Sequence, residues 1–376
     1  MRKFHKQQLL EIIQSLHTLH QESRDKLAKK DYPAVQSALS DCQEAAIQMG
    51  EAIEQLAGNG TEAVTYLEQY CEKLYQTNIQ LNEISAQKYY KSLEGILIKA
   101  ENSITHMPVR KEAVFLPYKA SMWDSLESVW KAADEDPDCD AYVIPIPYLD
   151  KNPDGSFREV HYEAELYPAY VPVTKYDEFD FGEHRPDMIF IHNPYDAANF
   201  VTSVHPFFYS DNLKQFTDKL VYIPYFVIDE VDPENKAAVE GMKHFCTVPG
   251  VFNADKVIVQ SEKMRQVYIN VLTDVTGENT RRIWEEKISG LGSPKYDKVS
   301  NTRKEDLEIP EEWRNIIEKP DGSRKKVIFY NTSINGLLHH NENMINKMQH
   351  VFNIVKEHQD EVALLWRPHP LIQATV

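Results

Sequence analysis

Polar side chains follow apolar, strand-like runs at four places in the sequence, and two of these places lie before residue 220. His192 comes directly after the run MIFI, and His205 lies in an aromatic loop just ahead of Asp211 and Asn212. Ligands of open α/β sheets bind beyond the carboxyl ends of the strands, so side chains at these points can meet a ligand. A single histidine at such a place packs more often than it reacts, and both interpretations stay open.

The other two places lie near the end of the sequence. Asn331 and Thr332 follow the run VIFY, where a hydroxyl group and the backbone N–H groups of a helix start could hold a phosphate. Arg367 and His369 follow the run ALLW. A guanidinium fork and an imidazole that project together from a rigid strand are suited to a pyrophosphate.

None of the strong cofactor or metal motifs occurs in the sequence. There is no G-x-G-x-x-G, no G-x-x-x-x-G-K-[ST], no H-E-x-x-H and no cysteine pair at zinc spacing, so neither a metal nor a cofactor is predicted. The turn around Gly290 and Gly292 is a weak phosphate-loop signal, and a tight turn that needs positive φ is the plainer interpretation. The four cysteines lie far apart, which indicates a reducing compartment.

The net charge of the chain limits the kinds of molecule that it can bind. The 376 residues contain 41 Lys or Arg and 58 Asp or Glu, a formal net charge of −17. Residues 132–187 alone contain 15 acidic and 4 basic residues, a local net charge of −11. Binding of nucleic acid is not expected, because phosphate contacts need concentrated Lys and Arg. The acidic stretch is a solvated surface, or a rim that repels anions or binds a cationic group.

The first 105 residues have the period of amphipathic helices. Breaks at Asp31-Tyr32-Pro33 and at Gly58-Asn59-Gly60-Thr61 divide them into three helices, the third covering residues 62–103. Three such helices predict a helical hairpin or small bundle. The bundle packs on the rest of the protein, or it serves self-association or a contact with a membrane. No signal peptide or membrane-spanning run is present, so a cytoplasmic protein is expected, with the inner face of the membrane as a further location.

The period changes at residue 111, where short apolar strands begin to alternate with helices. Residues 110–299 predict a Rossmann-like domain with a parallel sheet, and residues 300–324 a linker. Residues 325–376 contain strand, helix and strand, the start of a second Rossmann-like domain. Two strands and one helix are too few for an independent sheet, so we expect a truncated chain or a fragment. The fold class is therefore α/β, preceded by an all-α bundle.

Residues 187–376 resemble the CDP-glycerol glycerophosphotransferases of teichoic-acid synthesis. The resemblance rests on the order and spacing of four segments, and residues 1–105 lie outside it. The segments are YSDNLKQFTDKL at 209–220, ADKVIVQSEKMRQVYI at 254–269, GLGSPKYD at 290–297, and VIFYNTSI followed by LLWRPHPL.

The resemblance implies two facing Rossmann-like domains, the GT-B architecture. The first would receive a polymer or lipid acceptor and carry Asp211 and Asn212 on its cleft side. The second would bind a CDP-alcohol through Thr332, Arg367 and His369 while an acceptor hydroxyl attacks phosphorus. The family usually has Trp-His-Gly after a strand of the first domain, whereas this strand ends Tyr222-Ile-Pro-Tyr-Phe226. Hence His205 serves as the base, or the reaction differs or is absent.

Three functions stay open from the sequence. The first is transfer of glycerol phosphate or a related group from a nucleotide-activated donor to a cell-surface acceptor. The second is a non-catalytic binding or scaffold protein, which the missing His-Gly favours. The third is a nucleotide-sugar glycosyltransferase of the same architecture.

Overall fold

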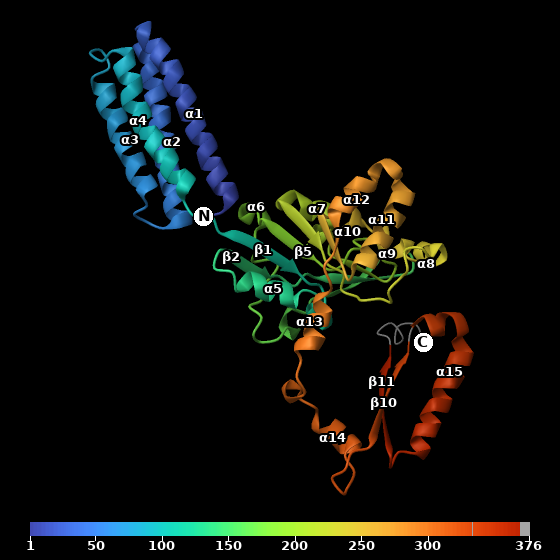
Figure 1. Ribbon diagram of the computed structural model, residues 1–376. Helices are drawn as coiled ribbons and strands as arrows, with labels where there is room; N and C mark the ends of the chain where they lie inside the picture. The colour runs from blue at the N-terminus through green and yellow to red at the C-terminus, as the bar shows by residue number, and fades with distance from the viewer. Residues whose placement is uncertain (333, 369–376) are drawn as a thin grey trace. The chain divides into compact units, whose positions relative to one another are not determined.

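The computed structural model describes residues 1–332 and 334–368. The chain divides into two compact units, Met1–Ser300 and Asn301–Val376. The first unit contains a helical bundle and a parallel sheet, and the second contains a short sheet with one long helix (Figure 1).

Residues 1–107, all of which the structure describes, form four long helices and not the three that we expected. They are α1 (Lys3–Ala28), α2 (Tyr32–Ala57), α3 (Glu62–Ile79) and α4 (Ala86–His106). Asp31, Thr61 and Ser85 begin the last three, and each side chain accepts a hydrogen bond from a backbone N–H three residues on. The third predicted helix is interrupted after Ile79, and Gly95 lies inside α4 without breaking it.

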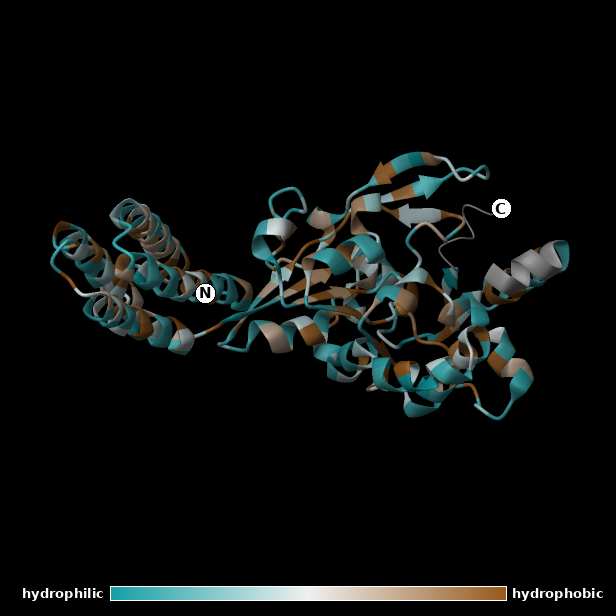
Figure 2. Ribbon diagram, turned by 90° about the horizontal axis from the view of Figure 1, so that it is seen from above, coloured by the Kyte–Doolittle hydropathy of each residue, from teal (hydrophilic) through white to brown (hydrophobic). Residues whose placement is uncertain are grey.

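The bundle is held together by one apolar stripe from each helix. These residues recur every three or four positions, so they lie on one side of each helix and meet in a common core. Figure 2 shows the apolar colour on the inner sides of the helices and along the strands of the sheet. The largest fully buried side chains of this core are Ile13, Met49, Ile53, Leu67, Tyr70, Leu74, Tyr89, Leu93 and Leu97.

The sheet of the first unit has six strands, all parallel, in the described part of the chain. Their order across the sheet is β2-β1-β5-β7-β8-β9. This arrangement confirms the α/β fold class with a preceding bundle. The strands are β1 (Lys111–Leu116), β2 (Cys139–Val143), β5 (Met188–Ile191), β7 (Lys219–Tyr222), β8 (Lys256–Val259) and β9 (Ile288–Gly290).

Both faces of the parallel sheet are covered, which explains why its strands are apolar throughout. Val114 and Leu116 of β1 belong to a large core that also contains Val267 and Leu272 of a helix, α11. Ala113 and Phe115 point to the opposite face and pack with Trp123 and Trp130. The helices of the domain are α5 (Glu127–Asp134), α6 (Phe181–His184), α7 (Ser210–Leu213), α8 (Lys236–Gly241), α9 (Lys243–Cys246), α10 (Pro249–Asn253), α11 (Glu262–Thr276), α12 (Arg281–Lys287) and α13 (Pro294–Asn301).

A second, antiparallel sheet in this domain was not predicted. It has the order β4-β3-β6 and consists of β3 (Tyr148–Lys151), β4 (Phe157–His161) and β6 (Thr202–Val204). The turn that joins β3 to β4 contains Gly155 at φ 83°. The segment after β6 forms the single turn α7 and then a 3₁₀ turn, Lys214–Phe216, and the helix α13 begins just after Gly292.

The second unit contains α14 (Glu311–Ile317), β10 (Lys326–Thr332), α15 (Ile334–Glu357) and β11 (Val362–Pro368). The two strands are parallel neighbours in the sheet. Phe352 of α15 packs against Tyr330 and Trp366, so α15 covers the face on which those two rings lie. On the other face, Val327 and Phe329 are about half exposed.

In the described part of the chain, none of the helices is long and apolar enough to cross a membrane.

Candidate functional site

The carboxyl edge of the six-stranded sheet has a topological switch point between β1 and β5. From β1 the chain moves to β2 on one side, and it later returns to add β5 on the other side. The loops that follow β1 and β5 therefore diverge, and the crevice between such loops is where open α/β sheets bind ligands. Residues 117–119 follow β1 and residues 192–196 follow β5, so the site is built from these two segments.

His192 holds the two loops together. Its Nε2 accepts a hydrogen bond from the Tyr118 N–H at 3.0 Å, and its Nδ1 lies 2.8 Å from Ser125 Oγ. Ser125 Oγ donates in turn to the Met122 carbonyl at 2.7 Å, so Nδ1 carries the imidazole proton and donates it to Oγ. Burial lowers the pKa of His192 to about 3, and the charge of Lys295 acts in the same direction.

This geometry leaves His192 without an open face for a ligand. Its relative exposure is 0%, and both ring nitrogens are occupied. The sequence located it correctly at a strand end. Its contacts are those of a residue that fixes the Tyr118 loop, and direct contact with a substrate stays a prediction.

Tyrosines form a wall beside His192. The ring of Tyr118 meets His192 edge-on with centroids 5.3 Å apart, and it meets Tyr148 at 5.5 Å. Tyr225, which follows β7, lies 6.0 Å from Tyr118. Burial raises the pKa of Tyr118, Tyr195 and Tyr225, so these hydroxyl groups stay protonated at neutral pH.

A cation and a carboxylate lie beside this wall. The Lys119 ammonium lies 4.7 Å from the ring centroid of Tyr148 and 5.7 Å from that of Tyr118. Glu163 accepts hydrogen bonds from Tyr148 Oη and from the Ala120 N–H, each at 2.8 Å. Tyr118 and Tyr148 are buried, and His161 stacks on Tyr148 with ring centroids 4.9 Å apart. The rings therefore support the loop, and Lys119 is the group that can meet an anionic oxygen.

Lys119, Tyr148 and Glu163 were not predicted from the sequence. Lys119 follows a strand, so the rule that selected His192 could have selected it as well. Tyr148 and Glu163 come from β3 and from the loop after β4, and only the folded chain brings them to β1.

Asp196 connects the loop after β5 to the start of α7. It is buried at φ 48°, and its carboxylate accepts from the Ser210 N–H at 3.1 Å and from Ser210 Oγ at 2.6 Å. Burial raises its pKa to about 6, although the bonds from Ser210 oppose the shift. Because φ is positive, the loop is held in a conformation that few side chains adopt.

The predicted residues His205, Asp211 and Asn212 lie in the segment that Asp196 anchors. His205 is exposed, and its Nδ1 accepts from the Phe207 N–H at 3.3 Å. Asn212 Nδ2 donates to the Phe207 carbonyl at 2.7 Å, so both side chains fix the backbone around Phe207. Asp211 is exposed and caps the next residue's N–H at 2.9 Å. Among these three, His205 has one ring nitrogen without a hydrogen-bond partner in the part of the chain that the structure describes.

In the second unit, the strand pairing sets Asn331 beside Arg367. These two residues are register partners at the carboxyl ends of β10 and β11, and both are exposed. Thr332 points to the other face, where it is buried and its Oγ1 accepts from Trp366 Nε1 at 3.1 Å. The structure thus brings Asn331 and Arg367 together and separates Thr332 from them. His369 lies outside the described residues.

One described group of side chains has the spacing of metal ligands. Asp150, Glu159 and His161 offer ligand atoms within 4.8 Å of one another on the ladder of β3 and β4. The Asp150 carboxylate already accepts from His161 Nε2 at 3.0 Å and from Arg158 at 3.1 Å. The Arg158 guanidinium supplies the positive charge that a metal ion would bring. We therefore interpret the three residues as part of an ion-pair network and not as a metal site.

No family model matches the sequence, and no curated protein matches it. Among solved structures, an S. aureus MnaA–UDP co-structure matches with 12% identity and a TM-score of 0.40, covering 70% of this chain. A putative UDP-N-acetylglucosamine 2-epimerase from Listeria monocytogenes matches with 14% identity and a TM-score of 0.37, covering 71%. The match covers 64% of each of those two chains. A likeness of this degree carries no information about ligand or reaction.

Proposed function

We propose that the chain belongs to a GT-B-type transferase that uses a nucleotide-activated small molecule and transfers a group from it to a polymer or lipid acceptor. Glycerol phosphate from CDP-glycerol is the donor group that the sequence segments favour. The observation that carries the proposal is the register of Asn331 with Arg367 at the carboxyl ends of two parallel strands. At that point the guanidinium can donate two parallel hydrogen bonds to a diphosphate, and the neighbouring amide can donate another.

The acceptor site of the proposal is the carboxyl edge of the six-stranded sheet. Lys119 beside the tyrosine wall offers one cation at the switch point, and Lys295 is paired with Asp124 at 2.6 Å. His205 is the proposed base, because it is exposed and one of its ring nitrogens has no partner within the described chain. As a general base, His205 would take the proton from the hydroxyl group of the acceptor substrate as that oxygen attacks the donor.

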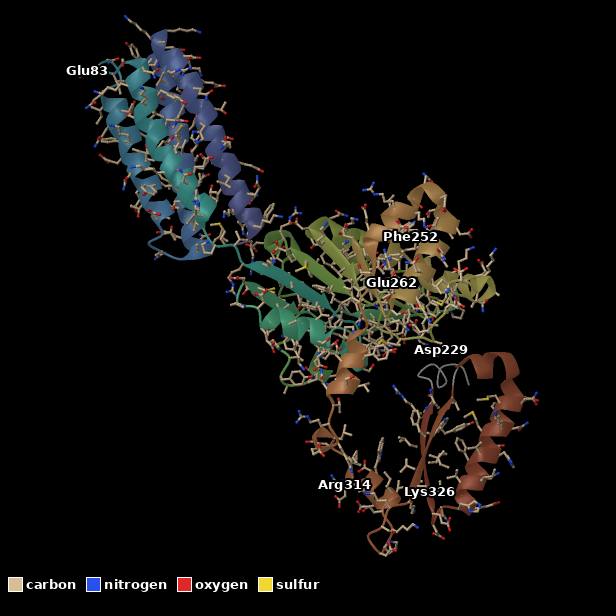
Figure 3. The ribbon with its side chains drawn as sticks, in the orientation of Figure 1. Glu83, Asp229, Phe252, Glu262, Arg314 and Lys326 are labelled. Carbon is tan, nitrogen blue, oxygen red and sulfur yellow. The ribbon has the colours of Figure 1, made fainter. Side chains whose placement is uncertain are left out.

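The proposal is tested by nucleotide binding to the full chain. CDP-glycerol, CDP, UDP-N-acetylglucosamine and UDP are compared by calorimetry and by the rise in Tm that a bound ligand produces. Arg367→Ala should weaken binding of the preferred nucleotide by about 10- to 100-fold, since a charge-assisted hydrogen bond contributes about 1.5–3 kcal/mol. Arg314→Ala, an exposed arginine of α14 (Figure 3), is the matched control and should change nothing.

Two results would contradict the proposal. One is that none of the four nucleotides binds at millimolar concentration. The other is that Arg367→Ala binds as tightly as the unaltered chain. Preference for a UDP-sugar over CDP-glycerol would instead favour the glycosyltransferase on the same architecture.

A non-catalytic binding protein is the second candidate, and one observation favours it. The segment after β7 lacks the His-Gly that the resembled family carries, and in it Tyr225 is partly buried, with a pKa that burial raises. Transfer assays with a polyol or polymer acceptor separate the two candidates. If nucleotide binds but turnover is absent, and His205→Ala has no effect on binding, the binding protein is correct.

A further inference from the structure

A groove of about 440 Å³ runs between α2 and α3 of the bundle, away from the residues of the proposed site. Its lining repeats with the same spacing on both helices, covering residues 43–54 of α2 and 64–75 of α3. On each helix this range spans a rise of eleven residues, which is about 16 Å or three turns of an α-helix. The groove is lined by Gln43, Ala46, Ile47, Gly50, Glu51, Glu54, Val64, Leu67, Glu68, Cys71, Glu72 and Tyr75.

The floor and two edges of the groove are apolar. Ile47 is 48% exposed and Tyr75 is 57% exposed, so a large apolar side chain borders the groove on each helix. Gly50 lies about one turn after Ile47 on α2, and a Cβ atom built on it would meet nothing within 4 Å. A helix that enters the groove can therefore approach the α2 backbone closely at Gly50.

The rim of the groove is acidic. Glu51, Glu54, Glu68 and Glu72 line it, and among the described residues none of the four has an ion-pair partner. The segment from Tyr32 to Ile79 contains seven Asp or Glu against a single base, Lys73. Uncompensated carboxylates around an apolar floor attract a ligand that has one apolar side and carries positive charge beside it.

We propose that this groove binds an amphipathic helix rich in Lys or Arg, supplied by a partner protein. The apolar side of that helix would cover Ile47, Gly50 and Tyr75, and its basic residues would meet the glutamates on the rim. This is the helix-in-groove mode of recognition, in which anchors at i, i+3, i+4 and i+7 fill the groove. A second copy of the same face carries the same charge and would be repelled, and so would an anionic membrane surface.

The probe is a fluorescein-labelled peptide of about 14 residues, four helical turns, with leucine on one face and lysine on the other. Binding to the full chain is followed by fluorescence anisotropy. We expect saturable binding that weakens as salt is raised, because salt screens exposed charges. A peptide with glutamate at every lysine position should not bind.

Two glycine substitutions localise the binding. Gly50→Leu fills the groove and should weaken binding at least tenfold, whereas Gly95→Leu, at an exposed position inside α4 with equal free space, should leave it unchanged. Neither change removes a positive-φ glycine, since both residues lie inside helices. The bound peptide should also slow the alkylation of Cys71, which lines the groove, while the buried Cys42, Cys139 and Cys246 serve as internal references.

Charge reversal gives a test that does not depend on the glycine variant folding. Glu51→Lys with Glu68→Lys should abolish binding of the basic peptide, and Glu22→Lys with Glu83→Lys, at exposed positions elsewhere in the bundle, should not. Equal affinity in the two double variants would overturn the proposal, as would unchanged alkylation of Cys71. So would a dimer in light scattering that Gly50→Leu dissociates, because the occupant would then be a second copy.

Discussion

His192 is a histidine that stays neutral in the folded protein far below the pH at which a free imidazole becomes charged. The reason is that its ring is enclosed and one nitrogen must accept a bond from the Tyr118 N–H. Protonation would break that bond and place a charge in the core. The residue thus connects the conformation of the β1 loop to the ionisation of one side chain.

This connection predicts the direction of a pH effect. The folded pKa of about 3 is below the ordinary 6.5, so the contribution of His192 to stability is complete above pH 6.5 and is lost as the pH falls towards 3. Between pH 7 and 4.5 the unaltered chain should lose about 2–3 kcal/mol more than His192→Gln, at 1.36 kcal/mol per pH unit. Urea unfolding followed by tryptophan fluorescence measures the difference.

Glutamine suits this comparison because it can accept from Tyr118 and donate to Ser125 without titrating. His106→Gln, at an exposed position, is the control and should follow the unaltered chain at both pH values. If His192→Gln loses as much stability at low pH as the unaltered chain does, His192 is not the group that titrates.

At the level of residues, the sequence predicted which side chains lie at strand ends, but it did not predict which of them are buried or which way they face. The rule that ligands meet strand ends selected His192, Asn331 and Arg367, and all three do lie at the carboxyl ends of parallel strands. The rule could not show that His192 is enclosed or that Thr332 faces away from Arg367. Those facts depend on which side of each strand a neighbour covers, and a linear pattern does not contain that information.

At the level of elements, Gly290 shows why the turn after β9 needs glycine at that position. A Cβ atom on Gly290 would lie 2.5 Å from the Ser261 carbonyl oxygen, because β9 passes directly against the start of α11. Gly292, two residues on, has φ 106° and supplies the tight turn that the sequence predicted. The first glycine therefore serves close packing and the second serves backbone geometry.

Gly290→Ala should destabilise the sheet domain by about 2–3 kcal/mol, since backbone atoms of α11 and β9 must move apart. Thermal unfolding detects this as a lower Tm. Gly241→Ala is the matched control, because a Cβ atom there meets nothing within 4 Å, and its Tm should stay the same or rise slightly. An unchanged Tm for Gly290→Ala would mean that the approach of β9 to α11 is looser than described.

The elements that the sequence missed share one physical cause. The break between α3 and α4 falls at residues 80–85, where no glycine or proline occurs and only Ser85 marks a helix start. The strands β3, β4 and β6 are three to five residues long, and β3 pairs with β6 across a long separation in sequence as well as with β4 in a hairpin. Short strands and polar helix breaks are decided by tertiary contacts, whereas the long periodic helices and apolar strands are decided locally.

At the level of the molecule, an ion-pair cluster joins the bundle to the parallel sheet. The Arg2 guanidinium lies 2.6 Å from Glu112 of β1 and 2.6 Å from Asp140 of β2, and it donates to the Lys111 carbonyl at 3.1 Å. Glu112 is fully buried, and His184 Nδ1 is its second partner at 3.1 Å. Burial raises the pKa of Glu112 while Arg2 opposes the shift.

Arg2→Met should weaken this junction by about 3 kcal/mol, because it leaves a buried carboxylate without its main counter-charge. We expect faster hydrogen exchange in β1 and faster proteolysis of residues 107–110, while the interior of the bundle keeps its protection. Arg158→Met removes an exposed ion pair and should change neither rate. If adding Glu112→Gln to Arg2→Met restores protection, the unpaired carboxylate is the cause of the weakening. Unaltered hydrogen exchange in Arg2→Met would refute the role of the ion pair in the junction.

The junction also makes the bundle a lever arm. The first and the last residues of the bundle segment are attached at the same place. The Arg110 N–H donates to the Met1 carbonyl, and Arg2 pairs with Glu112 of β1. Glu83 marks the opposite end of the bundle (Figure 3). A partner that grips α2 and α3 would apply torque through two attachments to β1, the strand from which Tyr118 and Lys119 extend. That load would reach the amino end of β1 first, at Arg2 and Glu112, and the loop that His192 secures lies at the other end of the same strand.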